Sequence, residues 1–492
     1  MRNLIKKVAG DTAIYGLPSI LSKSVGILVL PIVTRFLSPS DYGIIELLNI
    51  FGVVITSFII MGLNASRTII FYENDSGFTK SSLIKTYVLF LSTWGFFITL
   101  VAIIICPYIF SYGFNKNISI DLIIISFLGF FFAAIRNGIQ DFFRLLFWRF
   151  KFVFLSGLQL ALTYSLLLFM VSVLHWGLKG YFLGILAGTV ITLPIGIYWM
   201  IPMLRDRFSF SLLKKMVIIG VPVMPTDLAL SCITFSERFF ILRFLSLDDL
   251  GVYSVGARLA SIVLVLLWGF RLAWAPLALS LEKGAESFRF YSFMDGAIKV
   301  AASYVAILLT ALSPILITIF ADHRYFSGYK VVGFIAYGNF FASIYWISGL
   351  GILTNKKTTI YTLCIIISAL SSVFIIYHLT PFLGVVGAAA GGCLAHIIGN
   401  ILVIYFGEKC EPIGFSIVRT LLLVVWSFSA IFAEISIIES SLPLWVDISF
   451  ILTINIISLI CLPLLGIPMD ELSKLIRIVL VYFRINFIKN NK

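Results

Sequence analysis

The stretch Arg35-Phe-Leu-Ser-Pro-Ser-Asp-Tyr-Gly43 returns later in the chain as Arg243-Phe-Leu-Ser-Leu-Asp-Asp-Leu-Gly251. The two copies share the pattern R-F-L-S-x-x-D-x-G and lie 208 residues apart. A second pair of matching tripeptides precedes them, Gly16-Leu-Pro18 and Gly220-Val-Pro222, at an offset of 204 residues. The difference between the offsets is about one helical turn, so it leaves helix faces in register. The chain therefore contains an internal repeat, which predicts two similar lobes.

The composition places this repeat in a membrane protein. Of the 492 residues, 60% are hydrophobic and 12% are charged, and the mean hydropathy is +1.07. Apolar runs of about 20 residues follow one another, each long enough to cross ~30 Å of hydrocarbon. We predict an all-α polytopic membrane protein with about fourteen transmembrane helices, at residues 12–36, 43–65, 82–108, 118–143, 152–174, 179–201, 216–242, 251–280, 295–321, 328–353, 358–379, 383–407, 417–438 and 443–466.

The net charge of +13 is a topology signal rather than a sign of nucleic-acid binding. With the amino terminus placed inside, 24 of the 36 Lys and Arg residues fall on cytoplasmic flanks, 6 fall outside and 6 fall within spans. Because basic residues gather on the cytoplasmic side of membrane proteins, both termini are expected in the cytoplasm. We therefore exclude nucleic acid as a partner and expect the membrane lipids to surround the chain.

Six predicted spans separate the two copies of the repeat. An even number means that both copies enter the membrane in the same direction, as in parallel transporter repeats. We expect an N-terminal lobe over residues 1–208 and a C-terminal lobe over residues 209–407, with a central cleft between them. Two further spans occupy residues 408–466. Residues 467–492 form either a basic amphipathic tail on the inner leaflet or ordinary topology charge.

Each copy of the repeat also looks like the start of a helix. Ser38 and Asp41 have the spacing of a capping box, with Pro39 at the first helical position. Ser246 and Asp249 have the same spacing in the second copy. The arginines that begin the two copies would lie at the outer membrane surface, where they act either as snorkelling anchors or in an outer gate.

Ionisable side chains inside spans are costly and usually face a cavity or a partner. By the 204-residue offset, Lys23 corresponds to Asp227, so we predict that they form a charge pair or an ion-coupling site; a static buried pair is the alternative. Glu237, nearer the outer end of the same span, is a second candidate for ion coupling. Asp295 and Lys299 fall in the first turn of a predicted span, where they are expected to snorkel toward water.

Basic and amide side chains are predicted to gather toward the inner side of the membrane. Trp268 and Trp274 lie three residues before and after Arg271, so on a helix all three share one face. This favours an arginine held between two indoles over a simple interfacial anchor. Arg136 forms a polar patch with Asn137, Gln140 and Asp141. The lower end of the second span offers Asn64 and Arg67. With Arg258, these residues predict a cationic inner vestibule. Arginine binds phosphate through paired hydrogen bonds, so the expected ligand is a phosphate-bearing anion.

The sequence offers no sign of catalysis. It contains no Walker loop, zincin motif or GxSxG, its four histidines are scattered, and its six cysteines are isolated. We therefore interpret the cysteines as small apolar residues. We expect no enzyme activity, no catalytic residue, no metal and no cofactor.

Four stretches carry a family resemblance: residues 10–43, the segment NASRTIIFYE at 64–73, the segment RLAWAPLAL at 271–279 and the segment GILTNKKT at 351–358. They resemble bacterial polysaccharide flippases of the Wzx type, whose superfamily also holds multidrug antiporters and the peptidoglycan lipid flippase. The resemblance covers essentially the whole chain and implies a two-lobed fold of fourteen helices.

The resemblance also implies a function. Such a protein would export an undecaprenyl-pyrophosphate-linked O-antigen or capsule repeat unit from the inner to the outer leaflet of the bacterial inner membrane by alternating access. A cationic cavity would hold the pyrophosphate and sugars, and we assign this role to Lys23, Arg136, Arg258 and Arg271. An O-antigen polymerase and a chain-length regulator are candidate partners.

Two rival functions remain open. A multidrug antiporter of the same fold would favour an acid-rich cavity for cationic drugs, whereas cations outnumber acids in these spans. An O-antigen polymerase or ligase is also many-spanning and basic, but typically carries a large outside loop, and no predicted outside loop here is long enough.

Overall fold

The structure, a computed structural model, describes residues 24–73, 78–114, 118–264, 284–355, 357–440 and 443–467, with residues 18, 21, 22, 267, 471 and 473. Within these ranges every regular element is a helix. The chain divides into two compact units. Unit 1 comprises residues 1–258, 317–328 and 380–388, and unit 2 comprises residues 259–316, 329–379 and 389–492.

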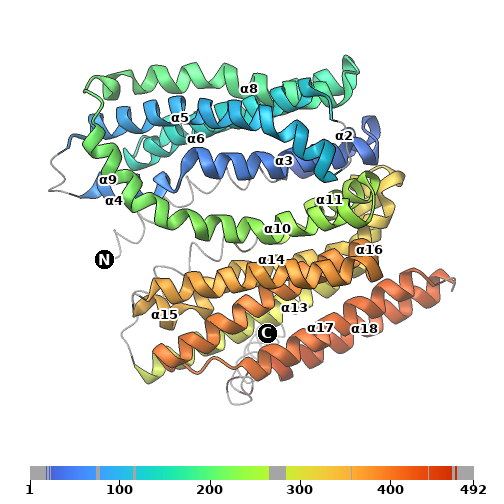
Figure 1. Cartoon of the computed structure of the whole chain (residues 1–492). Helices are drawn as coiled ribbons and strands as arrows, with labels where there is room; N and C mark the ends of the chain where they lie inside the picture. Colours follow the sequence, from blue (N-terminus) through green and yellow to red (C-terminus); the bar gives the residue numbers. More distant parts are fainter. Residues whose placement is uncertain are drawn as a thin grey trace, which may run out of the picture. The chain divides into compact units, whose positions relative to one another are not determined.

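Unit 1 is a bundle of long helices. Figure 1 shows α3, α5, α6 and α8 lying side by side in it, and the same helices contact one another along their lengths. Its elements are α2 (Leu30–Phe36), α3 (Pro39–Ile60), α4 (Leu63–Tyr72), α5 (Lys80–Tyr108), η1 (Ile109–Gly113), α6 (Ile120–Leu145), α7 (Arg149–Leu168), η2 (Phe169–Val173), α8 (Gly177–Met200), η3 (Ile201–Leu204), α9 (Phe210–Gly220), η4 (Val221–Val223), α10 (Met224–Phe244) and α11 (Leu247–Ala260).

The later part of the chain begins with α13, which runs from unit 2 into unit 1. Among the helices of unit 2, α17 and α18 pack against each other as an antiparallel pair (Figure 1). The elements of this part are α13 (Ala285–Phe320), η5 (His323–Gly328), α14 (Tyr329–Ser348), α15 (Leu350–Thr354), α16 (Thr358–Cys410), α17 (Ile417–Ile438) and α18 (Leu444–Gly466).

Ten helices of the described residues are long and apolar enough to cross a membrane, or up to eleven if the bent pair around η4 is one span. Among them, α16 has 53 residues and is interrupted by non-helical backbone at Gly384. At 1.5 Å per residue it is roughly 80 Å long, more than twice the hydrocarbon thickness. It therefore accounts for two of the predicted spans. Large parts of the first and eighth predicted spans lie outside the described residues, and the count of fourteen stays a prediction.

The structure confirms the predicted helix starts in both copies of the repeat. The Ser38 side chain accepts a hydrogen bond from the Asp41 backbone N–H at 3.1 Å, and the Asp41 carboxylate accepts from the Ser38 backbone N–H at 3.0 Å. Ser246 and Asp249 form the same pair of bonds, each at 3.1 Å. These bonds satisfy backbone donors that a helix start otherwise leaves without partners.

The two copies of the repeat also pack against each other, and their last glycines make this possible. A Cβ built on Gly43 would lie 2.2 Å from the carbonyl oxygen of Leu247. Reciprocally, a Cβ built on Gly251 would lie 1.9 Å from the carbonyl oxygen of Pro39. Leu247 and Pro39 occupy the same position in the repeat, so the contact is approximately two-fold symmetric. The motif is therefore a helix start and also half of a close helix crossing.

The segment after α13 is attached to the first copy of the repeat. Arg324 donates from Nη2 to the carbonyl oxygens of Thr34 at 3.0 Å and Arg35 at 3.2 Å. The Tyr325 hydroxyl donates to the Leu37 carbonyl at 3.0 Å. Slight burial raises the pKa of Asp322, but hydrogen bonds from Arg324 outweigh it and lower that pKa below its ordinary value. The end of α2 is thus capped by a guanidinium from a segment distant in sequence.

One expectation about intramembrane charges was wrong. Asp295 and Lys299 do not lie in the first turn of a helix, because α13 begins at Ala285, ten residues before the predicted start of this span. Their exposed fractions are 4% and 1%, so neither side chain snorkels to water. The polar residues before Asp295 belong to the same helix, and hydropathy alone does not mark a helix start in such a segment.

We predict that Gly251→Ala destabilises the protein, because the added methyl group has to displace a backbone carbonyl of the facing helix. Overpacking of this kind costs about 1–3 kcal/mol. Thermal unfolding of the purified protein in detergent measures the effect.

Gly129→Ala on α6 is the matched control, since nothing lies within 4 Å of a Cβ built there. Alanine favours helix over glycine by about 1 kcal/mol, so this control should be neutral or slightly stabilising. Equal stability of the two variants would contradict the close crossing.

Candidate functional site: a cavity in unit 1

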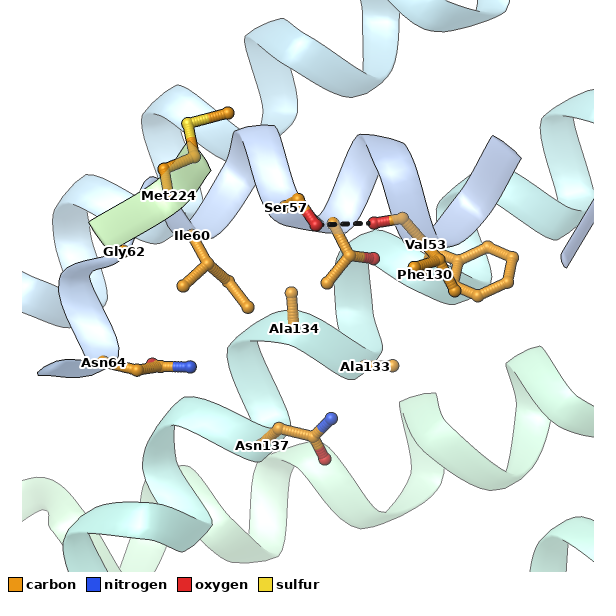
Figure 2. Close-up of a pocket in the computed structure, with 11 residues that line it drawn as sticks. Val53, Ser57, Ile60, Gly62, Asn64, Phe130, Ala133, Ala134, Asn137 and Met224 are labelled. Atoms are coloured by element: carbon orange, nitrogen blue, oxygen red, sulfur yellow. Dashed lines mark hydrogen bonds between the residues drawn. The ribbon is translucent and has the colours of Figure 1, made fainter. Parts of the chain in front are cut away.

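An open cavity of about 360 Å³ is formed by α3, the start of α4 and α6 of unit 1. Its wall includes two hydroxyls and two amides. The polar residues are Thr56, Ser57, Asn64 and Asn137. Most of the wall is apolar and is lined by Val53, Ile60, Phe130, Ala133, Ala134 and Met224. Figure 2 shows the amides of Asn64 and Asn137 approaching the same space from α4 and α6.

A break between α3 and α4 shapes one end of the cavity. Met61 and Gly62 both have left-handed backbone, with φ of 49° and 69°, and this ends α3 so that Asn64 falls in the first turn of α4. A Cβ on Gly62 would lie 2.0 Å from the carbonyl oxygen of Gly220. Only glycine tolerates both the positive φ and this close approach. Gly220 belongs to the second Gly-x-Pro tripeptide of the repeat, so the repeat also helps to build the cavity.

The polar groups of the wall are oriented by neighbouring helices. The Asn64 side-chain oxygen accepts a hydrogen bond from the Tyr87 hydroxyl at 2.7 Å. Thr56 donates to the Gly52 carbonyl at 2.7 Å, and Ser57 donates to the Val53 carbonyl at 3.1 Å (Figure 2). Since the hydroxyl protons are used within α3, their oxygens remain available as acceptors. The wall therefore offers uncharged hydrogen-bonding groups.

Arg136 brings a positive charge next to the cavity. Its Nη2 donates to the side-chain oxygen of Asn137 at 2.7 Å, so the guanidinium is tied to a wall residue. Within the described part of the chain, the Nε of Arg136 is buried and has no hydrogen-bond partner. An unpaired buried donor costs about 1–3 kcal/mol, and more when it is charged. An anionic ligand group would satisfy this donor.

Arg67 does not line the cavity but is buried and paired with an acidic residue. It is 1% exposed, and its Nη2 pairs with the Asp141 carboxylate at 2.5 Å. The guanidinium carbon lies 4.9 Å from the ring centre of Tyr87 and 5.2 Å from that of Phe142. The charge of Arg67 is thus compensated by Asp141. Tyr87 also donates a hydrogen bond to Asn64, so the Arg67–Asp141 pair supports a residue of the cavity wall through Tyr87.

A second charged cluster lies at the other end of α3. Arg238 of α10 donates from Nε to Glu46 at 2.7 Å and lies 3.3 Å from Glu237. The side chains of all three are 11–14% exposed. On α11, the guanidinium of Arg258 lies 5.6 Å from the ring centre of Tyr42. Glu237 and Arg258, both predicted site residues, therefore belong to this cluster and not to the cavity.

The structure thus places the predicted residues in three settings. Asn64 lines the cavity and Arg136 is joined to it, Arg67 lies buried behind it, and Glu237 and Arg258 lie in the second cluster. Lys23 and Arg271 fall outside the described residues, as does the side chain of Asp227. Their predicted roles stay predictions.

Among the neutral polar residues of the cavity, Asn64 is a predicted site residue, and Asn137 is part of the predicted polar patch around Arg136. Thr56 and Ser57 are not among the predicted residues. A signal existed: two hydroxyls, a glycine and an asparagine follow one another over residues 56–64 in an otherwise apolar span. The partner of Arg67 could not be chosen from sequence, since Asp141 lies 74 residues away.

We predict that Asp141→Asn lowers stability strongly, because it leaves the buried Arg67 guanidinium without its counter-charge. Breaking one side of a buried ion pair costs about 3–5 kcal/mol. Chemical or thermal unfolding in detergent measures the loss.

Glu73→Gln is the control, since the Glu73–Lys215 pair at 2.8 Å is 35–42% exposed. Exposed pairs contribute about 0–1 kcal/mol. If the Asp141 variant were no less stable than this control, the buried pair would not support the cavity wall.

Residues 32–269 match a family model described as "Polysaccharide biosynthesis protein". No curated protein sequence matches the chain. Among the residues that the structure describes, no group of three His, Cys, Asp or Glu side chains is placed to hold a metal ion.

Solved structures share the fold. The inward-facing conformation of a multidrug resistance MATE family transporter of the MOP superfamily is 15% identical, with a TM-score of 0.61 over 84% of this chain and 96% of that one. The lipid II flippase MurJ, in an inward closed conformation, is 14% identical, with a TM-score of 0.62 over 90% of this chain and 97% of that one. The Vibrio cholerae MATE transporter VcmN, in the bent form, is 12% identical, with a TM-score of 0.54 over 84% and 99%.

Proposed function

We propose that this chain moves an undecaprenyl-pyrophosphate-linked oligosaccharide across the bacterial inner membrane. The family match over residues 32–269 and the MATE- and MurJ-like fold support its resemblance to the polysaccharide flippases. The oligosaccharide is an O-antigen or capsule repeat unit, carried from the inner to the outer leaflet by alternating access. The observation that carries the proposal is the cavity of unit 1, in which uncharged hydrogen-bonding groups lie beside the incompletely bonded Arg136.

The cavity wall has chemistry suited to a glycan head group. Sugar hydroxyls both donate and accept hydrogen bonds, and Asn64 and Asn137 offer amides that do the same. The oxygens of Thr56 and Ser57 add acceptors, and the ring of Phe130 adds an apolar surface. Arg136, joined to Asn137, supplies a donor for a phosphate oxygen. The polyprenyl tail would stay in the lipid.

The physical need for such a protein is clear. Pyrophosphate and several sugars cannot cross hydrocarbon alone, because burying charge and unpaired hydroxyls is prohibitively costly. With a membrane potential negative inside, each negative charge moved outward gains roughly 2.3 kcal/mol per 100 mV. The potential alone would therefore favour export of a pyrophosphate-linked head group.

The proposal includes the membrane topology expected from the sequence. The N-terminal lobe over residues 1–208 and the C-terminal lobe over residues 209–407 would be parallel repeats about a central cleft, with two additional helices over residues 408–466. Both termini would lie in the cytoplasm, where the basic residues are concentrated. An O-antigen polymerase and a chain-length regulator would then act on the exported unit.

A multidrug antiporter is the alternative, since MATE transporters share the fold. A site for cationic drugs would need acidic groups, and none of the described residues that line the cavity is acidic. The two functions also differ in whether transport requires the positive charge of Arg136. A glycan exporter needs Arg136 to remain positive, whereas a drug antiporter would tolerate its neutralisation.

We predict that Arg136→Gln lowers translocation about tenfold or more, since a charge-assisted hydrogen bond is worth about 1.5–3 kcal/mol. Asn137→Ala should lower it too, because it removes an amide of the wall and frees the guanidinium. Each variant is expressed in a strain that lacks the gene, and lipid-linked repeat units remaining on the inner leaflet are quantified.

Arg144→Gln is the matched control on the same helix, since its side chain is 51% exposed. It should export normally at equal protein abundance. Normal glycan export in the deletion strain itself would reject the proposed function, as would an Arg136 variant that exports as well as the control.

A further inference from the structure

The helix pair α17 and α18 contains a buried acidic residue that the proposed function does not use. Glu434 of α17 is 0% exposed, and Asn455 of α18 is 8% exposed. The side-chain nitrogen Nδ2 of Asn455 donates a hydrogen bond to Oε1 of Glu434 at 2.7 Å. This bond links two helices that also pack against each other.

Two oxygens of this pair have no hydrogen-bond donor. Among the described residues, Oε2 of Glu434 and Oδ1 of Asn455 are buried and without a hydrogen-bond partner. The nitrogen of the amide is fixed in place, because it also donates to the Ile451 carbonyl at 2.9 Å and so uses both of its N–H groups. The pair therefore contains two surplus acceptors.

The basic residues of the neighbouring helices do not compensate a charge on Glu434. The helix α18 contains no lysine or arginine, and α14, which packs against α17, contains only Lys330. Lys330 forms an ion pair with Glu439, at the end of α17. Arg419 is the basic residue of α17 itself. It lies fifteen residues before Glu434, which is roughly 22 Å along the helix axis.

The helix α13 does not supply a counter-charge either. Its Lys299 contacts α17 at Thr420, near the end of the helix that is distant from Glu434, and is paired with Asp295. An ionised Glu434 would thus be a buried charge without a counter-ion among the described residues. Burial of such a charge is so costly that a carboxyl group becomes neutral instead.

A neutral carboxylic acid accounts for both observations. It carries no charge, and its O–H group is a hydrogen-bond donor. A carboxylic acid and an amide can pair through two hydrogen bonds, one from the amide N–H and one from the acid O–H. The first of these bonds is present. The second requires a proton on Oε2 of Glu434 and a lone pair on Oδ1 of Asn455, the two atoms without partners.

We propose that Glu434 is held as the neutral carboxylic acid and donates to Oδ1 of Asn455, so that the two side chains clasp α17 to α18. The carboxylate takes up one proton from water when the helices come together, and no other covalent bond is made or broken. Polar side chains that bond across helices hold them together in lipid, where apolar contacts alone give little preference for helix over lipid. The clasp lies in unit 2 and does not rest on the proposed function.

Infrared difference spectroscopy of the purified full-length protein at neutral pH tests the protonation state. The C=O band of a carboxylic acid is separate from the bands of ionised carboxylates. Subtracting the Glu434→Gln spectrum from the wild-type spectrum should leave one carboxylic-acid band. Asn455→Leu removes the acceptor of the O–H group, so this band should move to higher frequency in that variant.

Glu439→Gln is the matched control, because Glu439 lies at the end of the same helix and its side chain is 46% exposed beside Lys330. Its difference spectrum should show the loss of an ionised carboxylate and no carboxylic-acid band. The absence of a carboxylic-acid band from the Glu434→Gln difference spectrum would overturn the proposal.

Hydrogen exchange, followed by mass spectrometry on variants with a monodisperse gel-filtration profile, tests the clasp. Asn455→Leu should raise amide exchange severalfold in α17 and α18. Glu434→Gln should leave this exchange near the wild-type level, since its amide keeps both a donor and an acceptor for Asn455. Unchanged exchange in Asn455→Leu would contradict the clasp, and so would a rise in Glu434→Gln as large as that in Asn455→Leu.

Discussion

The hydrocarbon core of a membrane supplies neither water nor counter-ions, so every charged side chain in a spanning helix needs a partner or a cavity. This constraint accounts for the polar interior of the protein. Arg67 has Asp141, Arg238 has Glu46 and Glu237, and Lys299 has Asp295. The pairs of Arg67 with Asp141 and of Arg238 with Glu46 join different helices, and every pair compensates a charge.

Several buried polar atoms of the described residues have no hydrogen-bond partner, among them the Nε atoms of Arg67 and Arg136. Arg67 has Asp141 as its counter-charge, whereas Arg136 donates to the neutral Asn137 beside the cavity. In a medium where an unpaired polar group is costly, such a group is where a ligand gains most by binding. Arg136 therefore suits an anionic glycan head group.

The sequence predicted well those features that depend on local chemistry. Residues 417–438 were predicted as a span and are the helix α17, and both capping boxes form as their spacing predicted. Asn64 lines the cavity because it follows the glycine that breaks α3 from α4. These features need only a few consecutive residues, so the linear pattern contains them.

Features that depend on tertiary packing could not be predicted in this way. The reciprocal contact of Gly43 and Gly251 requires two helix starts to cross, although the repeat itself was visible in the sequence. Asp295 and Lys299 were misplaced because a helix with a polar first part looks like a loop followed by a span. Whether an intramembrane charge faces a cavity or a partner is decided by residues far away in the chain, as Arg67 and Asp141 illustrate.

The most direct measurement of the proposed transport uses the purified protein in proteoliposomes that contain a lipid-linked pyrophosphate oligosaccharide. A membrane-impermeant periodate reagent oxidises sugars in the exposed leaflet only. With active protein, nearly all of the head groups should become accessible over time, whereas protein-free vesicles should stay near half. Protection that remains at half, together with uptake of a cationic dye by the same vesicles, would contradict glycan export and favour a multidrug transporter.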